Sequence, residues 1–192
     1  MLTIGILALQ GAFIEHSIAI KKLGYLVKEV KMPKDLESID GIILPGGEST
    51  AISNLLDSTG LRTPLQSQLN GGLPCMGTCA GMILLAKSVS QDSIPTLGVM
   101  NIEVKRNAYG RQLGSFTRTE VVRKISDMPI PLVFIRAPYV VKVDETVEIL
   151  HRVDQHIVAV RENNLLALAF HPEMTDDLTF HRYFIEMIQQ NG

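Results

Sequence analysis

The pattern with the clearest chemical meaning is the pentapeptide from Gly77 to Gly81, which places Cys79 between two glycines. Apolar residues precede and follow it, so the pattern predicts a buried strand, a sharp turn that holds Cys79, and a helix. A thiol at the start of a helix faces unpaired N–H groups that favour a thiolate, and the N–H of Ala80 would point toward an oxyanion formed by attack of the sulfur. The pattern indicates a nucleophile, but a buried thiol in a glycine-flanked turn would have the same sequence.

A cysteine nucleophile needs a base near neutral pH, and His171 has the most informative setting of the five histidines. It directly follows the apolar run from Leu165 to Phe170, so we expect it at the end of a strand, before a turn fixed by Pro172. Active sites of open parallel sheets form beyond the carboxyl ends of strands, where Cys79 is also expected. Glu173 could then hydrogen-bond the second imidazole nitrogen. The alternative is a structural His-Pro turn with a surface glutamate.

A second loop of interest runs from Pro45 to Ser49 and follows another apolar run. Glycines at positions 46 and 47 would let the backbone approach a ligand closely, and the N–H of Gly47 is the expected second oxyanion donor. The loop lacks the lysine of a phosphate-binding P-loop, so a nucleotide site is not expected. The alternative is a turn that closes a strand-helix unit, with Glu48 or Ser49 capping the next helix.

Two arginines are candidates for holding a carboxylate. Arg106 lies in a polar, hairpin-like segment, and Arg136 follows an apolar strand that ends at Ile135. An arginine at a strand end can bind a carboxylate through two hydrogen bonds, although an isolated arginine is more often a solvated charge.

The other histidines show no metal-like spacing, and we expect them on the surface or on helix faces. Glu15 and His16 follow the first strand closely and could line a contact surface. No metal site or cofactor is expected. These other histidines are His16, His151, His156 and His181.

Length and composition set limits on the class of protein. The chain has 192 residues, which suits one domain over residues 1–192, and a formal net charge of -2 without a long basic run, which argues against nucleic-acid binding. No apolar stretch approaches the roughly 20 residues that span a bilayer, and no signal peptide is recognised, so no membrane partner is expected. Cys75 and Cys79 fit neither a disulfide framework nor a CxxC motif, which favours the cytoplasm. Cys75 has no assigned role beyond a packed strand thiol.

The order of expected elements indicates an α/β fold. Strands alternate with helices in the first half, which predicts a mostly parallel central sheet flanked by helices. In the second half no convincing helix separates the strands, so antiparallel additions are expected before a last helix from about residue 178 to 189. Strands are expected at 3–9, 25–30, 41–44, 73–76, 99–105, 116–122, 132–135, 147–150, 157–160 and 165–170, and helices after Gly11, around 52–56, at 61–69 and after Gly81.

Taken together, these motifs are more specific than any one of them. The Gly-Thr-Cys-Ala-Gly elbow, the Pro-Gly-Gly-Glu-Ser loop and the late His-Pro-Glu resemble the class I, triad-type glutamine amidotransferases. Further segments resemble the glutaminase subunits of pyridoxal 5'-phosphate synthases, and the similarity extends from the first strand to the last helix. These are Leu9-Gln10-Gly11 with Glu15-His16, Arg106-Asn107-Ala108-Tyr109-Gly110-Arg111-Gln112, Phe134-Ile135-Arg136-Ala137-Pro138 and the run from Phe170 to Asp177.

The resemblance implies a flavodoxin-like glutamine amidotransferase fold and a glutaminase that forms a γ-glutamyl thioester on Cys79. It implies that His171 transfers protons, that Glu173 orients it, and that the N–H groups of Gly47 and Ala80 hold the oxyanion. Ammonia would pass to a (β/α)8 synthase subunit, which in the family forms a large ring decorated with glutaminase subunits. The glutamine-site residues implied are Gly46, Gly47, Glu48, Ser49, Arg106, Ile135 and Arg136, and Gln10, Glu15 and His16 are candidates for the partner contact.

The two glycines at 46 and 47 suggest that their shared peptide flips when the partner docks, which would prevent wasteful hydrolysis of glutamine. Two other interpretations remain open. DJ-1/PfpI-like hydrolases also carry a cysteine on such a turn, but they do not account for the His-Pro-Glu and Pro-Gly-Gly-Glu-Ser segments together. A non-catalytic binding subunit on the same scaffold would not need to keep Cys79, His171 and Glu173.

Overall fold

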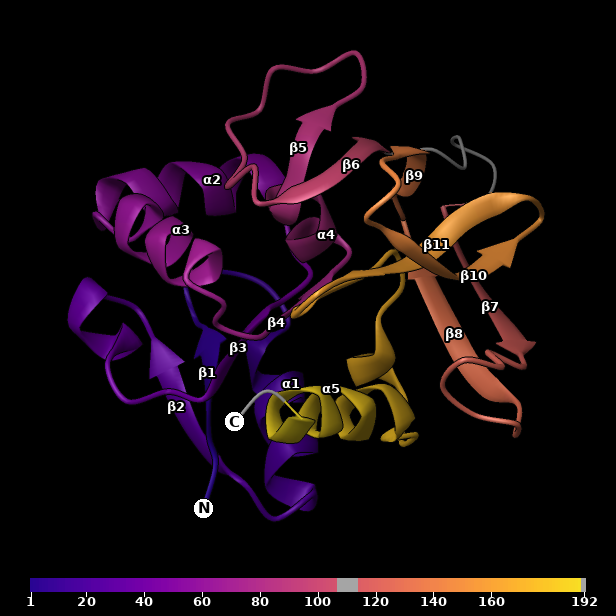
Figure 1. The fold of residues 1–192 in the computed structure, drawn as a ribbon, viewed down its shortest axis with the longest axis horizontal. Coiled ribbons are helices and arrows are strands. Elements are labelled where there is room, and N and C mark those ends of the chain that lie inside the picture. The colour runs from indigo at the N-terminus through magenta and orange to yellow at the C-terminus, as the bar shows by residue number, and fades with distance from the viewer. Residues whose placement is uncertain (107–113, 191–192) are drawn as a thin grey trace.

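The computed structural model describes residues 1–106 and 114–190. One half of the main sheet is parallel, in the order β2-β1-β3-β4-β12. Four of its strands are almost completely buried because helices cover both faces of the sheet (Figure 1), whereas the edge strand β2 contains Lys28 and Glu29 and is partly exposed. The strands are β1 (Thr3–Leu7), β2 (Leu26–Val30), β3 (Gly41–Leu44), β4 (Cys75–Thr78) and β12 (Leu165–Leu168).

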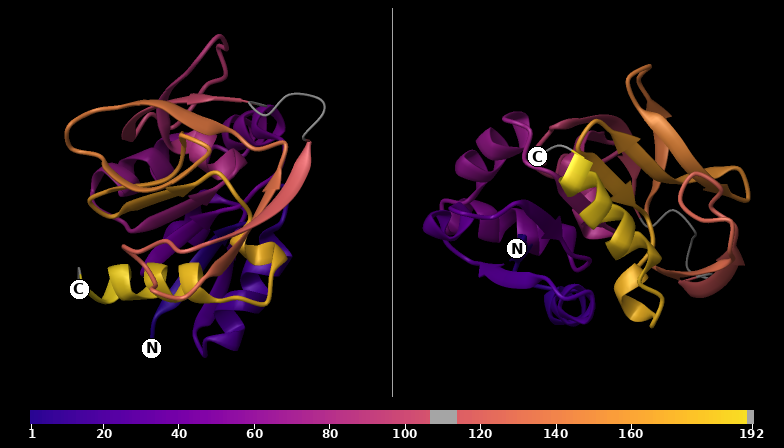
Figure 2. Two further views of the ribbon diagram at one scale, coloured as in Figure 1. Left: turned by 90° about the vertical axis from the view of Figure 1, so that its right-hand side faces the viewer. Right: turned by 60° about the horizontal axis from the view of Figure 1, so that its bottom comes forward.

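The helices form a layer on each face of this sheet. The helices α1 (Phe13–Lys22) and α5 (Thr179–Gln190) lie together on one face, and α2 (Ser49–Ser58), α3 (Arg62–Asn70) and α4 (Ala80–Leu85) lie on the other (Figures 1 and 2). The helix α5 buries Phe180, Phe184, Ile185 and Ile188, as its apolar spacing predicts. Short 3-10 turns, η1 (Pro33–Leu36) and η3 (Pro172–Met174), follow β2 and precede α5.

The rest of the sheet is joined by antiparallel pairs, except that its edge strand β5 runs parallel to β6. Beyond β12, the order continues through β11, β9, β6 and β5, with β10 paired to β11, and β7 and β8 form a separate hairpin. The mixed sheet confirms the predicted α/β fold with antiparallel additions. These strands are β5 (Ala86–Val89), β6 (Met100–Lys105), β7 (Ser115–Glu120), β8 (Ile130–Ile135), β9 (Tyr139–Val143), β10 (Glu148–Val153) and β11 (His156–Glu162).

The structure corrects several expectations. Strands β5 and β9 were not predicted, because β5 follows α4 without a break and β9 has only a short apolar run. Ile14 and Ile18 are about half exposed, so α1 packs through residues that include Ala19 and Ile20 instead. The segment from Asn107 to Gln112, which is part of the family resemblance, lies outside the described residues.

His16 and His181 lie on faces of the helices α1 and α5, which was one of the two expected placements. The other placement, on the surface, is wrong, since both side chains are completely buried between α1, α5 and the sheet. A buried His16 cannot contribute a surface contact to a partner.

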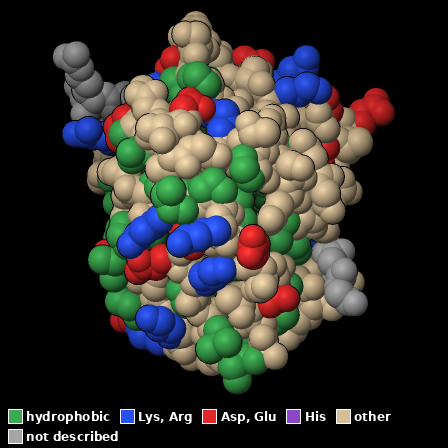
Figure 3. All heavy atoms as spheres, turned by 90° about the vertical axis from the view of Figure 1, so that its left-hand side faces the viewer, with side chains coloured by type: hydrophobic (Ala, Val, Ile, Leu, Met, Phe, Trp, Pro, Cys, Tyr) green, Lys and Arg blue, Asp and Glu red, His purple; other side chains and the backbone are tan. Residues whose placement is uncertain are grey.

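The face formed by β2, η1 and α3 carries basic and acidic side chains side by side (Figure 3). One such pair is Lys31 with Glu29, at 2.6 Å. Among the described residues, no helix is both long enough and apolar enough to cross a bilayer.

Candidate active site

Cys79 lies in the turn between β4 and α4, as the elbow pattern predicts. Its backbone is strained, with φ 48° and ψ -101°, a combination that residues other than glycine rarely adopt. The turn is tight because a Cβ on Gly81 would lie 2.0 Å from the carbonyl oxygen of Leu44. The N–H of Cys79 donates to the carbonyl of Leu168 at 2.8 Å, which fixes the elbow to the end of the neighbouring strand β12.

His171 follows that same strand, so the two predicted site residues emerge from adjacent strand ends. Its backbone N–H donates to the carbonyl of Val133 in β8 at 2.8 Å, which connects the site to the antiparallel half of the protein. Its Nδ1 lies 2.7 Å from Oε1 of Glu173, and both side chains are buried. The predicted hydrogen bond between His171 and Glu173 is therefore confirmed.

The electrostatic surroundings favour an imidazolium at His171. Burial alone lowers the pKa of His171, but hydrogen bonds and negative charge from Cys79 and Glu173 outweigh it and raise the pKa to about 10. A sulfur, an imidazole and a carboxylate in this order form the arrangement that activates a thiol for attack on a carbonyl carbon.

The glycine-rich loop packs directly against this histidine. A Cβ on Gly46 would lie 2.2 Å from Cε1 of His171, so only glycine fits beside the ring. The carbonyl of Gly46 accepts a hydrogen bond from the N–H of Ala12 at 2.9 Å, and Oε1 of Gln10 accepts one from the N–H of Glu48 at 2.9 Å. The loop before α1 therefore holds the predicted oxyanion loop in position.

A cavity of about 480 Å³ opens beside the sulfur and the imidazole. Nearly all the predicted catalytic and glutamine-binding residues line this cavity. Ala80, Glu173 and Gln10 are not among its lining residues. Sequence reasoning missed four of the lining residues, Gly11, Ala12, Ile83 and Met174. The predicted residues in the lining are Gly46, Gly47, Glu48, Ser49, Cys79, Arg106, Ile135, Arg136 and His171.

Comparisons with known proteins decide the family. The chain matches the SNO glutamine amidotransferase family over residues 6–190. The chain belongs to this family.

Relatives of the SNO family cover almost the full length of the chain. The "Pyridoxal 5'-phosphate synthase subunit PdxT" of Ruminiclostridium cellulolyticum is 53% identical, over 98% of this chain and 100% of its own. The protein of the same description from Carboxydothermus hydrogenoformans is 49% identical, over 96% and 97%. A solved structure described as "Crystal structure of glutamine amidotransferase" has a TM-score of 0.92 at 42% identity, covering 97% of this chain and 98% of that one. The chain is thus a glutamine amidotransferase, and its fold matches that of the class.

Within this SNO-family site, Glu48 has the capping role that was the alternative interpretation. Its carboxylate accepts hydrogen bonds from the N–H groups of Thr50 at 3.0 Å and Ala51 at 2.6 Å, at the start of α2. Burial raises the pKa of Glu48, but these backbone hydrogen bonds outweigh burial and lower it. Arg106 lies 3.2 Å from the same carboxylate and 2.6 Å from that of Asp92, which sequence reasoning did not identify.

The opposite wall of the cavity contains a second strained residue. Arg136 has φ 45°, and its N–H donates to the carbonyl of Gly114 at 2.5 Å. The carbonyl of Ile135 lies 3.9 Å from the sulfur of Cys79. The strained turn therefore brings the end of β8 over the nucleophile.

Sequence reasoning also missed a buried polar cluster behind Glu173, formed by His16, Thr78 and His181. The available signal was periodicity, since His16 is in phase with the buried Ala19 and Ile20 on α1. Across the described residues, no group of His, Cys, Asp and Glu side chains is arranged to hold a metal ion.

Proposed function

We propose that this protein hydrolyses L-glutamine to L-glutamate and ammonia through Cys79, His171 and Glu173, and delivers the ammonia to a pyridoxal 5'-phosphate synthase subunit. The observation that carries the proposal is the hydrogen-bonded pair of His171 and Glu173 beside a strained cysteine that opens onto a cavity. The descriptions of the PdxT relatives supply the synthase.

In the proposed reaction, the Cys79 thiolate attacks the side-chain amide carbon of glutamine. The His171 imidazolium gives its proton to the nitrogen as the C–N bond breaks, which releases ammonia and leaves a γ-glutamyl thioester. His171, now neutral, removes a proton from a water molecule, and the hydroxide attacks the thioester. The C–S bond then breaks, which releases glutamate and regenerates the Cys79 thiolate, while the proton taken from water restores the imidazolium of His171.

Two backbone N–H groups are proposed to hold the oxyanion, one from Gly47 and one from Ala80. Ala80 is the first residue of α4, so its N–H lies at the positive end of that helix. Arg106 and Arg136 line the cavity and would attract the α-carboxylate of glutamine. Gly46, Glu48, Ser49 and Ile135 complete the proposed glutamine site.

The proposed partner contact includes Gln10, in the loop before α1, and Glu15, in the first turn of α1. Gln10 holds the backbone of Glu48, and neighbouring Ala12 holds the carbonyl of Gly46. A flip of the Gly46–Gly47 peptide would break the hydrogen bond to Ala12, so a partner that moves this loop would control the oxyanion donor. The partner is proposed to be a (β/α)8 synthase subunit in a ring.

We further propose that residues 1–192 act as one domain and that the protein works in the cytoplasm. A single core that extends across both halves of the sheet supports the first proposal. The need for a reduced thiol at Cys79 supports the second.

Glutamate release from glutamine, with and without the synthase subunit, tests the proposal. We expect turnover with the partner, little without it, and none above background for Cys79→Ala. Cys75→Ala is the matched control, because Cys75 is completely buried at the start of the same strand and should be dispensable. Full activity of Cys79→Ala would disprove the site assignment, and equal turnover without the synthase would disprove activation by the partner.

A further inference from the structure

Behind the triad, a second buried imidazole faces Glu173. His16, on α1, places its Nε2 3.4 Å from Oε2 of Glu173 and 3.2 Å from Oγ1 of Thr78. Its Nδ1 lies 2.9 Å from Nε2 of His181 on α5. The two carboxylate oxygens of Glu173 therefore face different histidines, with Oε1 toward His171 and Oε2 toward His16.

The contacts decide which nitrogen of His16 carries the proton. Burial, together with the neighbouring His181 and His171, lowers the pKa of His16 well below its ordinary value, so the ring is neutral and has one N–H. A proton on Nδ1 would leave the lone pair of Nε2 facing a carboxylate oxygen, which is repulsive. A proton on Nε2 can be donated to the carboxylate or to Thr78, while Nδ1 accepts from Nε2–H of His181.

We propose that His16 is a positioning residue of the glutaminase, which donates Nε2–H toward Oε2 of Glu173 and thereby holds Oε1 against the imidazole of His171. His181 acts one step further away by fixing the tautomer of His16. This inference rests on the proposed function, because it assigns a role in the same triad.

A neutral donor suits this position for an electrostatic reason. Oε2 of Glu173 is buried and has no close hydrogen-bond partner among the described residues, and a buried carboxylate oxygen without a donor is costly. A lysine or arginine here would neutralise the carboxylate and weaken its hold on His171. A neutral imidazole orients the carboxylate and leaves its negative charge to stabilise the imidazolium of His171.

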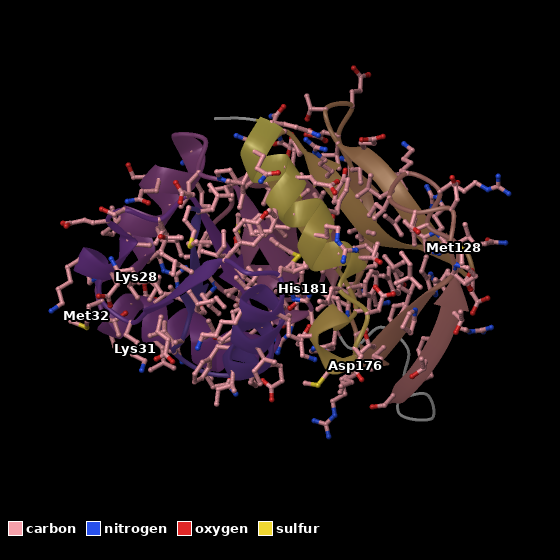
Figure 4. All side chains as sticks on the ribbon, turned by 90° about the horizontal axis from the view of Figure 1, so that it is seen from below. Lys28, Lys31, Met32, Met128, Asp176 and His181 are labelled. Atoms are coloured by element: carbon pink, nitrogen blue, oxygen red, sulfur yellow. The ribbon has the colours of Figure 1, made fainter. Side chains whose placement is uncertain are left out.

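The cluster lies between α1 and α5, and Figure 4 shows His181 between these two helices and Asp176 nearer the edge of the molecule. On its outer side, Glu173 borders a surface cavity of about 400 Å³ between α1 and η3. The titratable and charged groups around the cluster are Cys79, His171, Glu173 and His181, Asp177 beside His181, and Glu15, Lys22 and Asp176 around the outer cavity.

The test follows alkylation of Cys79 by iodoacetamide against pH, read by intact mass on the full chain in a Cys75→Ala background. In His16→Leu the carboxylate of Glu173 is no longer held with Oε1 against His171, so the imidazolium of His171 is less favoured and the thiolate forms less readily. We expect the pH of half-maximal alkylation to rise by about 0.5–1 unit. His16→Gln retains an amide donor and should restore a profile close to that of the unmodified chain. Ile20→Ala, one turn along the buried side of α1, controls for loss of packing and should leave the profile unchanged.

Either an unchanged profile in His16→Leu or an equal shift in Ile20→Ala would overturn the proposal. A second measurement does not depend on the folding of a variant: ¹⁵N NMR of histidine-labelled protein should show His16 protonated at Nε2, and protonation at Nδ1 would overturn it. Neither readout uses glutamine or the synthase. A chain that shows these signatures but hydrolyses no glutamine would refute the proposed function and retain the role of His16.

Discussion

Two buried histidines at either end of one polar cluster have opposite charge states. His171 is 6% exposed and has a pKa raised to about 10, whereas His181 is completely buried and its pKa is lowered to about 4. Burial lowers the pKa of both. The difference is the partner of each ring, since His171 faces the thiol of Cys79 and the carboxylate of Glu173, and His181 faces the neutral ring of His16. In this protein, neighbours rather than depth decide which imidazole carries charge.

The largest expected effect comes from exchanging each histidine for glutamine. His171→Gln removes the group that transfers protons, and we expect glutamine hydrolysis with the synthase subunit to fall about 10⁴-fold. His181→Gln retains a donor for His16 and should stay within about 10-fold of the unmodified chain. Glutamate release measures both variants, and equal losses would remove the functional distinction between the two rings.

A smaller effect is expected for Glu173→Gln, which removes the charge of the carboxylate but keeps its size. We expect kcat/KM to fall about 10²-fold. Glu173 raises the pKa of His171, so without its charge the imidazolium loses its proton at lower pH. The alkaline limb of the pH profile of kcat/KM should therefore move toward lower pH. An alkaline limb at the same pH would show that Glu173 does not stabilise the imidazolium of His171.

The dependence of folding stability on pH, below neutral pH, tests the charge state of His181. The pKa of His181 is lower in the folded protein, at about 4, than its ordinary value of 6.5, so below pH 6.5 the unfolded chain binds more protons. Folding stability is therefore lost as pH falls from about 6.5 toward 4. Urea unfolding at pH 7 and pH 5 should show that the chain loses about 1–2 kcal/mol more than His181→Gln does. An equal loss in both proteins would contradict a neutral, buried His181.

The smallest effect is expected at Thr78, whose hydroxyl lies within hydrogen-bond distance of the same nitrogen of His16 that faces Glu173. Thr78→Val should lower the free energy of unfolding by about 1 kcal/mol, because it removes one buried hydrogen bond. Glutamine hydrolysis should change by less than about 2-fold, since the Nε2–H of His16 remains available to Glu173. A large loss of activity would show that the Thr78 hydroxyl is needed to hold His16 against Glu173, and would contradict a direct hold of Glu173 by His16 alone.

The two histidines also show what the sequence could reveal. His171 was predictable because it follows an apolar run and precedes a proline, so its place at a strand end depends on neighbours in the sequence. Cys79 was also predictable from its neighbours in the sequence, since Gly81 is needed where the turn packs against the carbonyl of Leu44 and Gly77 is needed where it packs against Gly81. The alternation of strands and helices likewise predicted the parallel half of the sheet.

What could not be predicted depends on contacts between distant segments. His16 and His181 meet across α1 and α5, and only tertiary packing decides that the side of α1 with Ile14 and Ile18 faces outward. The register of β9 against β6 is also decided by long-range pairing. A surface position was one of two expected for His16 and His181, and that expectation fails where polar groups satisfy one another in the interior.

The helix α1 has one further consequence. Its outward side presents Ile14 and Ile18, and its inward side presents His16 to the carboxylate of Glu173. A molecule that binds the two isoleucines would contact the same turns of α1 that carry the imidazole of His16. This outer side of the helix is about one helix diameter, or ~10 Å, from the side that faces the catalytic residues. The helix α1 thus connects an exposed apolar surface on its outer side with the catalytic triad on its inner side.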